Sequence, residues 1–265
     1  MISIVTPSFN RCHTLDRLWS SLCEQTGTDE FEWLLVDDGS TDGTRDWFYN
    51  LKPNPRFQAR YVYQANQGKH IAINTAASHA HGDWVLILDS DDAITPDAIQ
   101  TIIDTLSQLR HDDRLVGICF RKQFFGGELV GQVVDSQSPI SLTPNQAGLR
   151  FKGDLAYVIH VNALLKHPFP VISGENFVPE QLVWNRISDD GRIYYHPSKA
   201  IYLCEYLPDG YTRNFKRVLK QNPLGFGLFY HDQRNRLEIG WPWLKASLRW
   251  IQCRVYRFFT RRKEN

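Results

Sequence analysis

Cysteine is scarce and scattered in this sequence of 265 residues. The five cysteines stand at positions 12, 23, 119, 204 and 253, and no Cys-x-x-Cys pair occurs. An odd, dispersed set argues against a disulfide framework, and the missing pairs argue against a zinc ribbon. The sequence therefore favours a reducing compartment.

Long hydrophobic runs are also missing. The longest strictly apolar run, Trp84 to Leu88, has about five residues, far below the roughly 18 that a membrane-spanning helix needs. The opening residues Ile2 to Thr6 carry no basic leader and turn at Pro7, which predicts a strand rather than a signal peptide. If the protein meets a membrane, we expect it to lie on the surface.

A dominant charge of either sign is absent. The chain has 30 Lys and Arg against 29 Asp and Glu, a formal net charge of +1 at pH 7. This balance excludes a globally basic nucleic-acid binder and a globally acidic disordered chain. It hides an asymmetry, because residues 241–265 hold seven basic residues and one acidic residue. The 23 basic and 28 acidic residues before them give a net charge of −5.

Short apolar runs alternate with helical patterns in the first half. The runs cover residues 2–6, 32–36, 60–63 and 84–88. Each is followed by apolar residues at helical spacing, in segments that include Leu15–Leu22, Trp47–Leu51, Ile71–Ala76 and Ile99–Leu106. Four strand–helix repeats predict an α/β fold with a parallel sheet covered on both faces.

The second half loses this rhythm. We expect strands over 115–121, 128–134 and 193–195, a loop over 139–144 and a helix over 179–187. The change near residue 112 predicts three parts: an α/β half (1–112), a mixed half (113–240) and a C-terminal helix (241–265).

Polar residues follow each of the four predicted strands of the first half, where a parallel sheet binds its ligands. They form the sets Thr6–Arg11, Asp37–Asp42, Asn66–Lys69 and Asp89–Asp92. Three carboxylates within Asp89–Asp92 favour a hard cation such as Mg²⁺ or Mn²⁺, with an acidic helix cap as the alternative. Asp37 and Asp38 fit either a ligand contact or a turn in which Ser40 or Asp42 caps a helix.

Together the segments VTPSFNR, LLVDDGSTDGT, NQGKHIAIN and LILDSDD resemble glycosyltransferase family 2. The resemblance implies a GT-A type fold, with a nucleotide-sugar-binding half followed by an acceptor-binding half. Gly174–Ile187 and Tyr206–Thr212 resemble segments of bacterial members, including enzymes that build surface polysaccharides. The expected partners are a nucleotide-sugar donor, favoured as a UDP-sugar, and a glycan or lipid-linked glycan acceptor, with no nucleic acid.

The resemblance also assigns residue roles. Asp38 corresponds to the carboxylate that bonds the uracil edge, with Asp37 structural or assisting. Asp89 and Asp91 match the Asp-X-Asp motif, which holds the divalent metal (Mn²⁺ or Mg²⁺), and Asp92 is an additional metal ligand. The expected nucleotide-binding set is Thr6, Pro7, Asn10, Arg11, Asp38, Lys69 and Asp89.

Sugar transfer with inversion requires a base for the acceptor hydroxyl. The resemblance makes Glu180 the candidate, with Glu175 in reserve, and an ordinary first-turn glutamate is the alternative. Trp184 shares a helix face with Glu180, where it fits the core better than a sugar-stacking role. His196, Asp209 and Tyr211 would reach the diphosphate or the acceptor if the later loop folds over the site.

Two other functions compete with sugar transfer. A sugar-1-phosphate nucleotidyltransferase would need a glycine-rich loop after the first strand, but Pro7–Arg11 contains no glycine. A catalytically inactive nucleotide- or glycan-binding module is the second alternative, against which the intact acidic cluster and Glu180 argue.

Residues 241–265 show apolar residues at helical spacing, with basic residues on the remaining faces. This pattern fits a basic amphipathic helix on an anionic membrane surface. It fits equally a terminal helix packed on the domain with its basic face in water. We expect a cytoplasmic protein, with peripheral contact at the inner face of the cell membrane as the membrane alternative.

Overall fold

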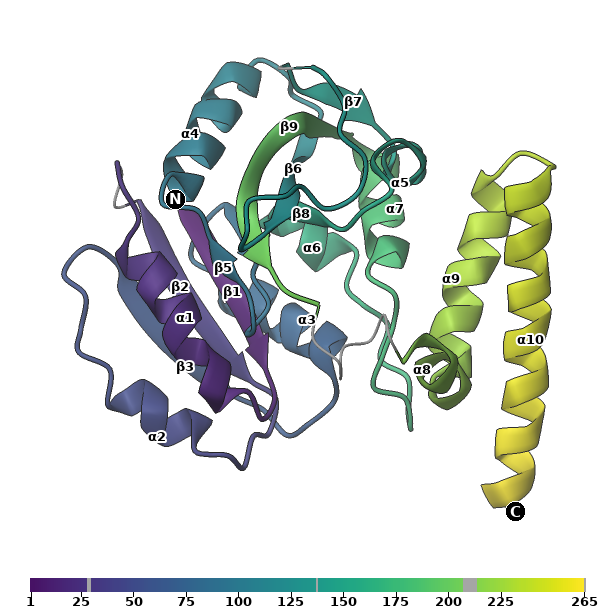
Figure 1. Cartoon of the computed structure of the whole chain (residues 1–265). Helices are drawn as coiled ribbons and strands as arrows, with labels where there is room; N and C mark the ends of the chain where they lie inside the picture. Colours follow the sequence, from purple (N-terminus) through teal and green to yellow (C-terminus); the bar gives the residue numbers. More distant parts are fainter. Residues whose placement is uncertain (28–29, 137, 207–213, 265) are drawn as a thin grey trace.

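The computed structural model describes residues 1–27, 30–136, 138–206 and 214–264 (Figure 1). Four parallel strands form one side of its sheet. They are β1 (Ile2–Ser8), β2 (Phe31–Asp37), β3 (Gln58–Tyr63) and β4 (Trp84–Ile87). Ser8 pairs with Asp37, and Asp37 pairs with Tyr63, so the strands end at one edge. The polar sets that follow the strands therefore gather at this edge.

The sheet continues without interruption into the second half. The strand order is β3-β2-β1-β4-β8-β6-β9-β5, with β7 paired to β9. The added strands are β5 (Ala93–Ile94), β6 (Leu115–Phe124), β7 (Ile140–Leu142), β8 (Leu155–His160) and β9 (Arg192–Cys204). Strand β8 runs antiparallel between β4 and β6, so β6, the first strand after residue 112, keeps the direction of β1 to β4 within the same sheet.

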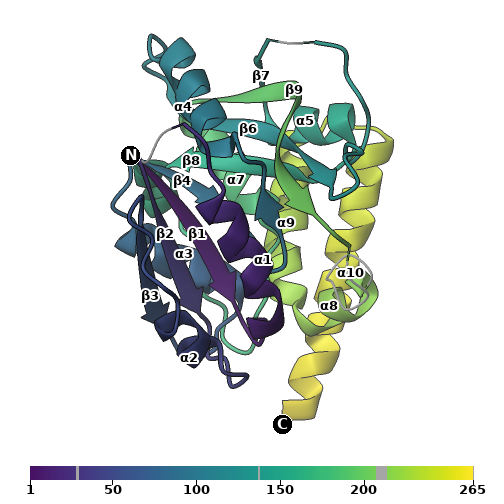
Figure 2. The same cartoon turned by 60° about the vertical axis from the view of Figure 1, so that its left-hand side comes forward.

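Helices cover both faces of the sheet, as predicted. One face carries α1 (Cys12–Cys23) and α4 (Ala98–Leu109), and the other carries α3 (Lys69–His79) and α7 (Gln181–Asp190). Alternate residues of β1 supply the two cores: Ile4 packs with Leu18 and Ile99, whereas Val5 packs with Ala76. Figure 2 shows α1 and α3 on opposite sides of β1 and β2.

Several expectations for the second half are wrong. Residues 128–134 form no strand and make a single bridge, from Leu129 to Gln123, because the chain turns at Gly131 in a left-handed conformation (φ 82°). The predicted loop 139–144 contains β7 and ends at α5 (Pro144–Phe151), whose first turn is capped reciprocally by Thr143 and Gln146. The predicted strand 193–195 is only the first part of β9, which continues to Cys204.

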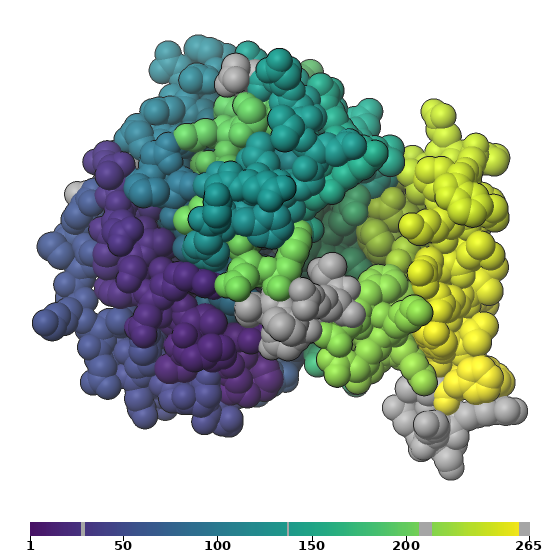
Figure 3. All heavy atoms as spheres, in the orientation of Figure 1, coloured from purple at the N-terminus to yellow at the C-terminus, as the bar shows by residue number. Residues whose placement is uncertain are grey.

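The remaining helices include α2 (Thr44–Tyr49) and α6 (Val161–Lys166), together with a group at the C-terminus. That group consists of α8 (Phe215–Gln221), α9 (Pro223–Arg236) and α10 (Trp241–Glu264). A small cluster of Val218, Leu219, Phe226 and Cys253 joins the three. In the space-filling view α10 forms the margin of the molecule farthest from the β1–β3 strands (Figure 3).

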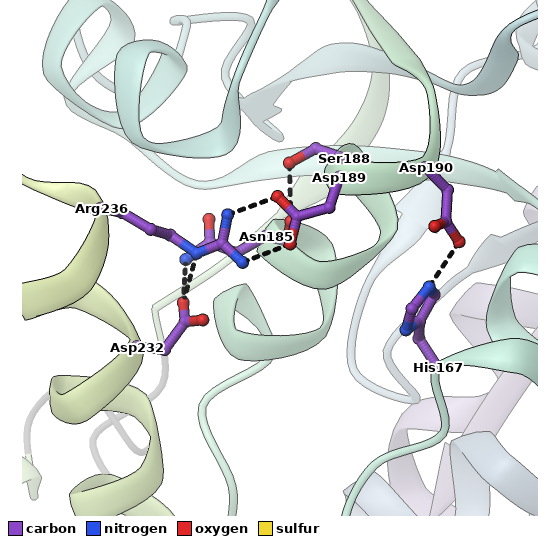
Figure 4. Close-up of polar contacts among 7 residues, drawn as sticks. All are labelled: His167, Asn185, Ser188, Asp189, Asp190, Asp232 and Arg236. Carbon is purple, nitrogen blue, oxygen red and sulfur yellow. Dashed lines mark hydrogen bonds and ion pairs between the residues drawn. The ribbon is translucent and has the colours of Figure 1, made fainter.

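A polar network attaches α9 to α7 (Figure 4). Asn185 donates to Asp232 at 2.9 Å, and the Arg236 guanidinium binds both Asp189 oxygens at 2.7 and 2.6 Å. Arg236 also donates to Asp232 at 2.8 Å. The bidentate geometry fixes the α9–α10 pair against the helix that follows Glu180.

Candidate active site

Lys69 lies between two carboxylates that are far apart in the sequence. Its Nζ is 2.5 Å from Asp89 Oδ1 and 2.8 Å from Glu180 Oε1. Lys69 is the first residue of α3, Asp89 follows β4, and Glu180 immediately precedes α7. All three side chains are partly exposed, between 27 and 35 %. The fold thus brings three of the predicted site residues together at the edge where the strands end.

The carboxylates hold Lys69 in its charged form. Burial disfavours the ammonium, but Asp89 and Glu180 outweigh it and raise the pKa of Lys69 well above its ordinary value. Burial likewise disfavours the Asp89 carboxylate, and Lys69 and Lys122 outweigh it, so that the pKa of Asp89 is lowered. This pair is therefore a stable ion pair near neutral pH.

At Asp91 and Asp92 the nearby cations do not outweigh burial and the charge of Asp89. Burial and the neighbouring Asp89 raise the pKa of Asp91, and the same two causes raise the pKa of Asp92 to about 7. Asp92 faces β9, where its Oδ1 accepts a hydrogen bond from the Glu205 amide at 3.4 Å. The crowded acidic groups suit a cation.

The three aspartates do not form a closed metal cage. Within the part of the chain that the structure describes, no group of three or more His, Cys, Asp or Glu side chains is placed to hold a metal ion. Their oxygens are nevertheless the donors that Mg²⁺ and Mn²⁺ prefer, and such cations often complete their coordination with substrate phosphates. The residues fit a cation shared with a bound phosphate better than a resident structural metal.

Asp38 holds the loop between β3 and α3, which directly precedes Lys69. Its buried carboxylate accepts hydrogen bonds from the Gln64 side chain at 2.7 Å and from the amides of Gln67 and Gly68 at 2.9 and 2.8 Å. Asp37 has a comparable role, accepting from the Ser40 amide at 2.7 Å and from Tyr61 Oη at 2.6 Å. Asp37 thus holds the loop after β2 and Asp38 the loop after β3, and their contact with a base remains a prediction.

The loops after β1 and β2 are linked to each other. Asn10, in a left-handed conformation (φ 52°), donates from its amide to Ser40 Oγ at 2.9 Å and accepts from the Thr41 amide at 2.8 Å. Of the two residues expected to bond a free helix amide, Asp42 accepts from Thr44 at 3.2 Å, and the N-cap position of α2 is Gly43, which has no side chain to cap it. These hydrogen bonds fix the loops after β1 and β2 relative to each other at the strand-end edge.

Two of the predicted nucleotide contacts lie inside the sheet. Thr6 and Pro7 are buried, and Thr6 Oγ1 accepts a hydrogen bond from Trp33 Nε1 at 3.0 Å. Their backbone is part of the pairing between β1 and β2, and their contact with a nucleoside remains a prediction. Arg11 directly precedes α1 and is partly exposed.

The family model for glycosyl transferase family 2 matches residues 3–154, more than half of the chain. The chain belongs to this family. The match covers every strand-end set described above, and it argues against the nucleotidyltransferase alternative.

Curated relatives agree with the family assignment. An uncharacterized glycosyltransferase of Nostoc sp. is 36 % identical over 103 residues, covering 39 % of this chain and 32 % of that protein. Chondroitin synthase of Escherichia coli is 37 % identical over 105 residues, covering 39 % of this chain and 15 % of the synthase. The match thus spans a third or less of each of these relatives.

Solved structures confirm the predicted α/β, GT-A type fold. Residues 1–349 of S. aureus TarS, in complex with UDP, align with a TM-score of 0.66 at 20 % identity, covering 95 % of this chain and 70 % of that one. The mannosyltransferase PcManGT from Pyrobaculum calidifontis, in complex with GDP-Man and Mn²⁺, aligns with a TM-score of 0.59 at 19 % identity, covering 96 % and 73 %.

Within this family 2 chain, the geometry separates the two base candidates. The Glu175 carboxylate accepts hydrogen bonds from the amides of Leu224 and Gly225 at 2.7 and 2.8 Å, which caps the first turn of α9. Burial raises the pKa of Glu175. Glu180 instead meets Lys69 beside Asp89. Glu175 thus caps a helix, whereas Glu180 lies with the other predicted site residues, and a role for either as base remains a prediction.

The other sequence candidates separate clearly. Trp184 is buried and stacks on Tyr157, with ring centroids 5.0 Å apart, so it is a core residue as favoured. The expectation for His196 is wrong, because its ring stacks on Phe120 and bonds to Thr105 Oγ1 at 3.1 Å, within the packing between β6, β9 and α4. Asp209 and Tyr211 lie outside the described residues.

Sequence reasoning missed the support that β9 gives to Asp89. The Asp89 amide donates to Tyr202 Oη at 2.9 Å, and the Lys122 ammonium lies 3.8 Å from the centroid of the Tyr202 ring. Arg17 of α1 donates to the Asp91 carbonyl and pairs with Glu205 at 3.2 Å. The sequence gives little signal for these contacts, because the pairing of β6 with β9 brings the residues together.

A cavity of about 850 Å³ adjoins the loops that carry Lys69 and Glu180. Both halves of the chain and α8 line it. The lining residues are Asn66, Gln67, Ile71, the segment 171–176, Arg217, Lys220 and Gln221. Its size suits a ligand of a few sugar rings.

Proposed function

We propose that this chain is an inverting glycosyltransferase that moves a sugar from a UDP-sugar to a hydroxyl group of a glycan acceptor, in polysaccharide or glycoconjugate synthesis. The observation that carries the proposal is the meeting of Lys69, Asp89 and Glu180 at the strand-end edge of a family 2 fold. Crystal structures of TarS hold UDP and UDP-GlcNAc, which supports the choice of donor.

The donor lies, on this proposal, along the strand-end edge. The Lys69 ammonium and the N-terminus of α3 favour the negative charge of the diphosphate. Asp89 contacts the ribose and Asp38 the uracil edge. The backbone of Thr6 and Pro7 and the side chains of Asn10 and Arg11 complete the nucleoside site.

A divalent cation fits between the acidic cluster and the diphosphate. Asp89, Asp91 and Asp92 are the residues that would hold Mn²⁺ or Mg²⁺, because these cations prefer carboxylate oxygens and all three aspartates lie within four residues. When bound, the cation would neutralise negative charge that develops on the leaving diphosphate. PcManGT, which shares the fold, was solved with Mn²⁺.

Glu180 is the proposed general base. The acceptor oxygen forms a bond to the anomeric carbon while the bond from that carbon to the diphosphate oxygen breaks. The acceptor's proton passes to Glu180, and the configuration inverts because the attack comes from the opposite side. Lys69 orients the Glu180 carboxylate through the 2.8 Å ion pair.

The cavity beside Gln67 is the proposed entrance for the acceptor. It lies between the loop before Lys69 and the segment before Glu180, so an acceptor seated there would come from the side of the base. Arg217 and Lys220 at its rim would favour an acceptor that carries negative charge, such as one with uronate or phosphate groups.

The decisive experiment is a screen of nucleotide sugars with Mn²⁺ or Mg²⁺, read out as released nucleotide diphosphate, followed by Glu180→Gln. We expect Glu180→Gln to lower turnover by about 10²- to 10⁴-fold while donor binding changes little, because a positioned base contributes that much. Glu128→Gln, at an exposed position, is the matched control and should leave turnover unchanged.

Two outcomes would contradict the proposal. Near-normal turnover in Glu180→Gln would rule out Glu180 as the base. Binding of nucleotide sugars without release of diphosphate, across the whole screen, would identify an inactive binding module instead.

A further inference from the structure

The outward face of α10 carries an unusually regular apolar stripe. Its six residues follow one another at alternating spacings of three and four, and each is between 42 and 74 % exposed. The outer stripe, as we call it, consists of Trp241, Leu244, Leu248, Ile251, Val255 and Phe258. Such a contiguous apolar face on a protein surface marks an interaction site.

The outer stripe is not the side by which α10 packs on the protein. Ala246 and Cys253, on the opposite side of the helix, are buried. On the same inner side Ser247 accepts a hydrogen bond from Arg234 of α9 at 2.9 Å, and the Arg234 guanidinium also lies 4.6 Å from the Trp250 ring centroid. The helix therefore has a packed face and, opposite to it, an apolar face.

Charge decides what covers the outer stripe. The positions that flank it at heptad spacing, of which Ser247 borders the packed face, contain three basic and no acidic residues: Lys245, Ser247, Gln252, Arg254, Phe259 and Arg261. A second copy of α10 would gain no ion pair along these flanks in either orientation, because they contain no acidic residue. An anionic lipid surface would instead attract the same flanks, at about 1 kcal/mol for each basic residue near the surface.

The length and composition of α10 agree with a helix that lies in the plane of a bilayer. Among the described residues no helix is long and apolar enough to cross a membrane. Trp241, in the outer stripe, supplies an amphipathic ring of the kind that settles at the headgroup level, whereas Trp243 and Trp250 lie against Arg234 of α9.

We propose that the outer stripe of α10 binds an anionic lipid bilayer. Through α9 and the Arg236 network, the bilayer would then stand in a fixed relation to α7 and to Glu180 at its start (Figure 4). This inference rests on the surface of α10 alone and does not depend on the proposed sugar transfer.

Co-sedimentation of the full chain with vesicles tests the proposal. The vesicles are phosphatidylcholine alone, or phosphatidylcholine with about one third phosphatidylglycerol. We expect binding only to the anionic vesicles, and a fall in binding of at least tenfold when salt rises from about 0.1 M to about 0.5 M. Leu248→Gln with Ile251→Gln, and separately Lys245→Glu with Arg254→Glu, should each weaken binding about tenfold or more.

Matched controls keep the test specific. Leu149→Gln with Val171→Gln removes exposed apolar residues from the body of the protein and should leave vesicle binding unchanged. Circular dichroism of each variant checks that the helices persist. The proposal is overturned if the wild type does not bind anionic vesicles at low salt, or if the stripe variants bind as well as the wild type. It is also overturned if light scattering finds that the wild type is a dimer and that the stripe variants are monomers.

Discussion

Lys69 is the residue at which the two halves of the candidate site meet. The sequence singles out Lys69, Asp89 and Glu180 one by one, each through its own motif. No spacing along the chain shows that one ammonium contacts both carboxylates, because residues 69, 89 and 180 come together only through the fold. The identities of these residues were thus predictable, and their connection was not.

Asp38 shows why residue roles are harder to predict than residue positions. A carboxylate after a buried strand suits a ligand as well as a turn, and the motif alone does not distinguish them. In the structure its oxygens hold the Gln67 and Gly68 amides, which shapes the loop before Lys69. His196 failed as a candidate for the opposite reason, since its surroundings depend on strand β9, of which the sequence predicted only a short piece.

Glu32 gives a test of the fold at the residue scale, away from the candidate site. Its buried carboxylate accepts from Ser3 Oγ and the His81 amide at 2.6 Å each, and from Arg60 at 3.0 Å. The His81 ring also lies 3.3 Å from it. Burial opposes the charged form, but these hydrogen bonds outweigh it and lower the pKa of Glu32. Glu32 therefore stabilises the fold above its ordinary pKa near 4.5, and this stability is lost as the pH falls through the lowered value.

We expect Glu32→Gln to lower the free energy of unfolding by about 1–3 kcal/mol at neutral pH, since it leaves buried donors poorly satisfied. The difference from wild type should shrink in acid, where the wild-type carboxyl is itself neutral. Urea unfolding between about pH 7 and about pH 3 measures it. Glu24→Gln, at an exposed position, is the control. A difference that stays constant across this range would contradict the assignment.

At the scale of elements, the first half was predictable and much of the second was not. Strands β1, β2 and β4 are buried, mostly apolar runs, and β3 is a partly exposed strand at the edge of the sheet, but each is followed by a helix pattern that local sequence specifies. Strand β8 pairs with residues 84–86 and 117–121, and its place between β4 and β6 depends on those distant partners. Short elements such as β7 and α6 carry too few residues for a periodic signal.

The loop between β3 and α3 offers a test at this scale. Gly68 has φ 94° and ψ 157°, a conformation open essentially to glycine alone, and a Cβ there would lie 2.0 Å from the Asn176 carbonyl oxygen. Gly68→Ala should lower the free energy of unfolding by about 2–4 kcal/mol and weaken donor binding, because it displaces the segment before Glu180.

Thermal unfolding and nucleotide titration of Gly68→Ala check both effects. Gly126→Ala is the matched control, because a Cβ at Gly126 meets open space and its φ is not positive. Unchanged stability and unchanged donor binding in Gly68→Ala would show that the contact with Asn176 does not constrain the site.

At the scale of the whole molecule, the attachment of α9 and α10 depends on few contacts outside their own cluster. Arg236→Met keeps the aliphatic stem and removes the bonds to Asp189 and Asp232. We expect a loss of about 1–2 kcal/mol, discounted because Asp189 is more than half exposed. Amide exchange should accelerate across 223–264 more than across β1 to β4.

Lys166→Met is the control for this prediction. It removes an exposed ion pair, from Lys166 to Asp190 at 2.9 Å, and such pairs contribute little. If Arg236→Met and Lys166→Met leave amide exchange equally unaltered, the network does not hold the C-terminal helices.

The antiparallel strand β8 has a consequence for how the chain could be divided. A fragment that ended near residue 112 would keep β1 to β4 and their helices, yet β4 would lose its neighbour and present open amides and carbonyls along an apolar strand. Such an edge is a template for pairing with other chains and for aggregation. Strand β8 therefore covers the edge of β4, and a fragment cut near residue 112 would be prone to aggregate.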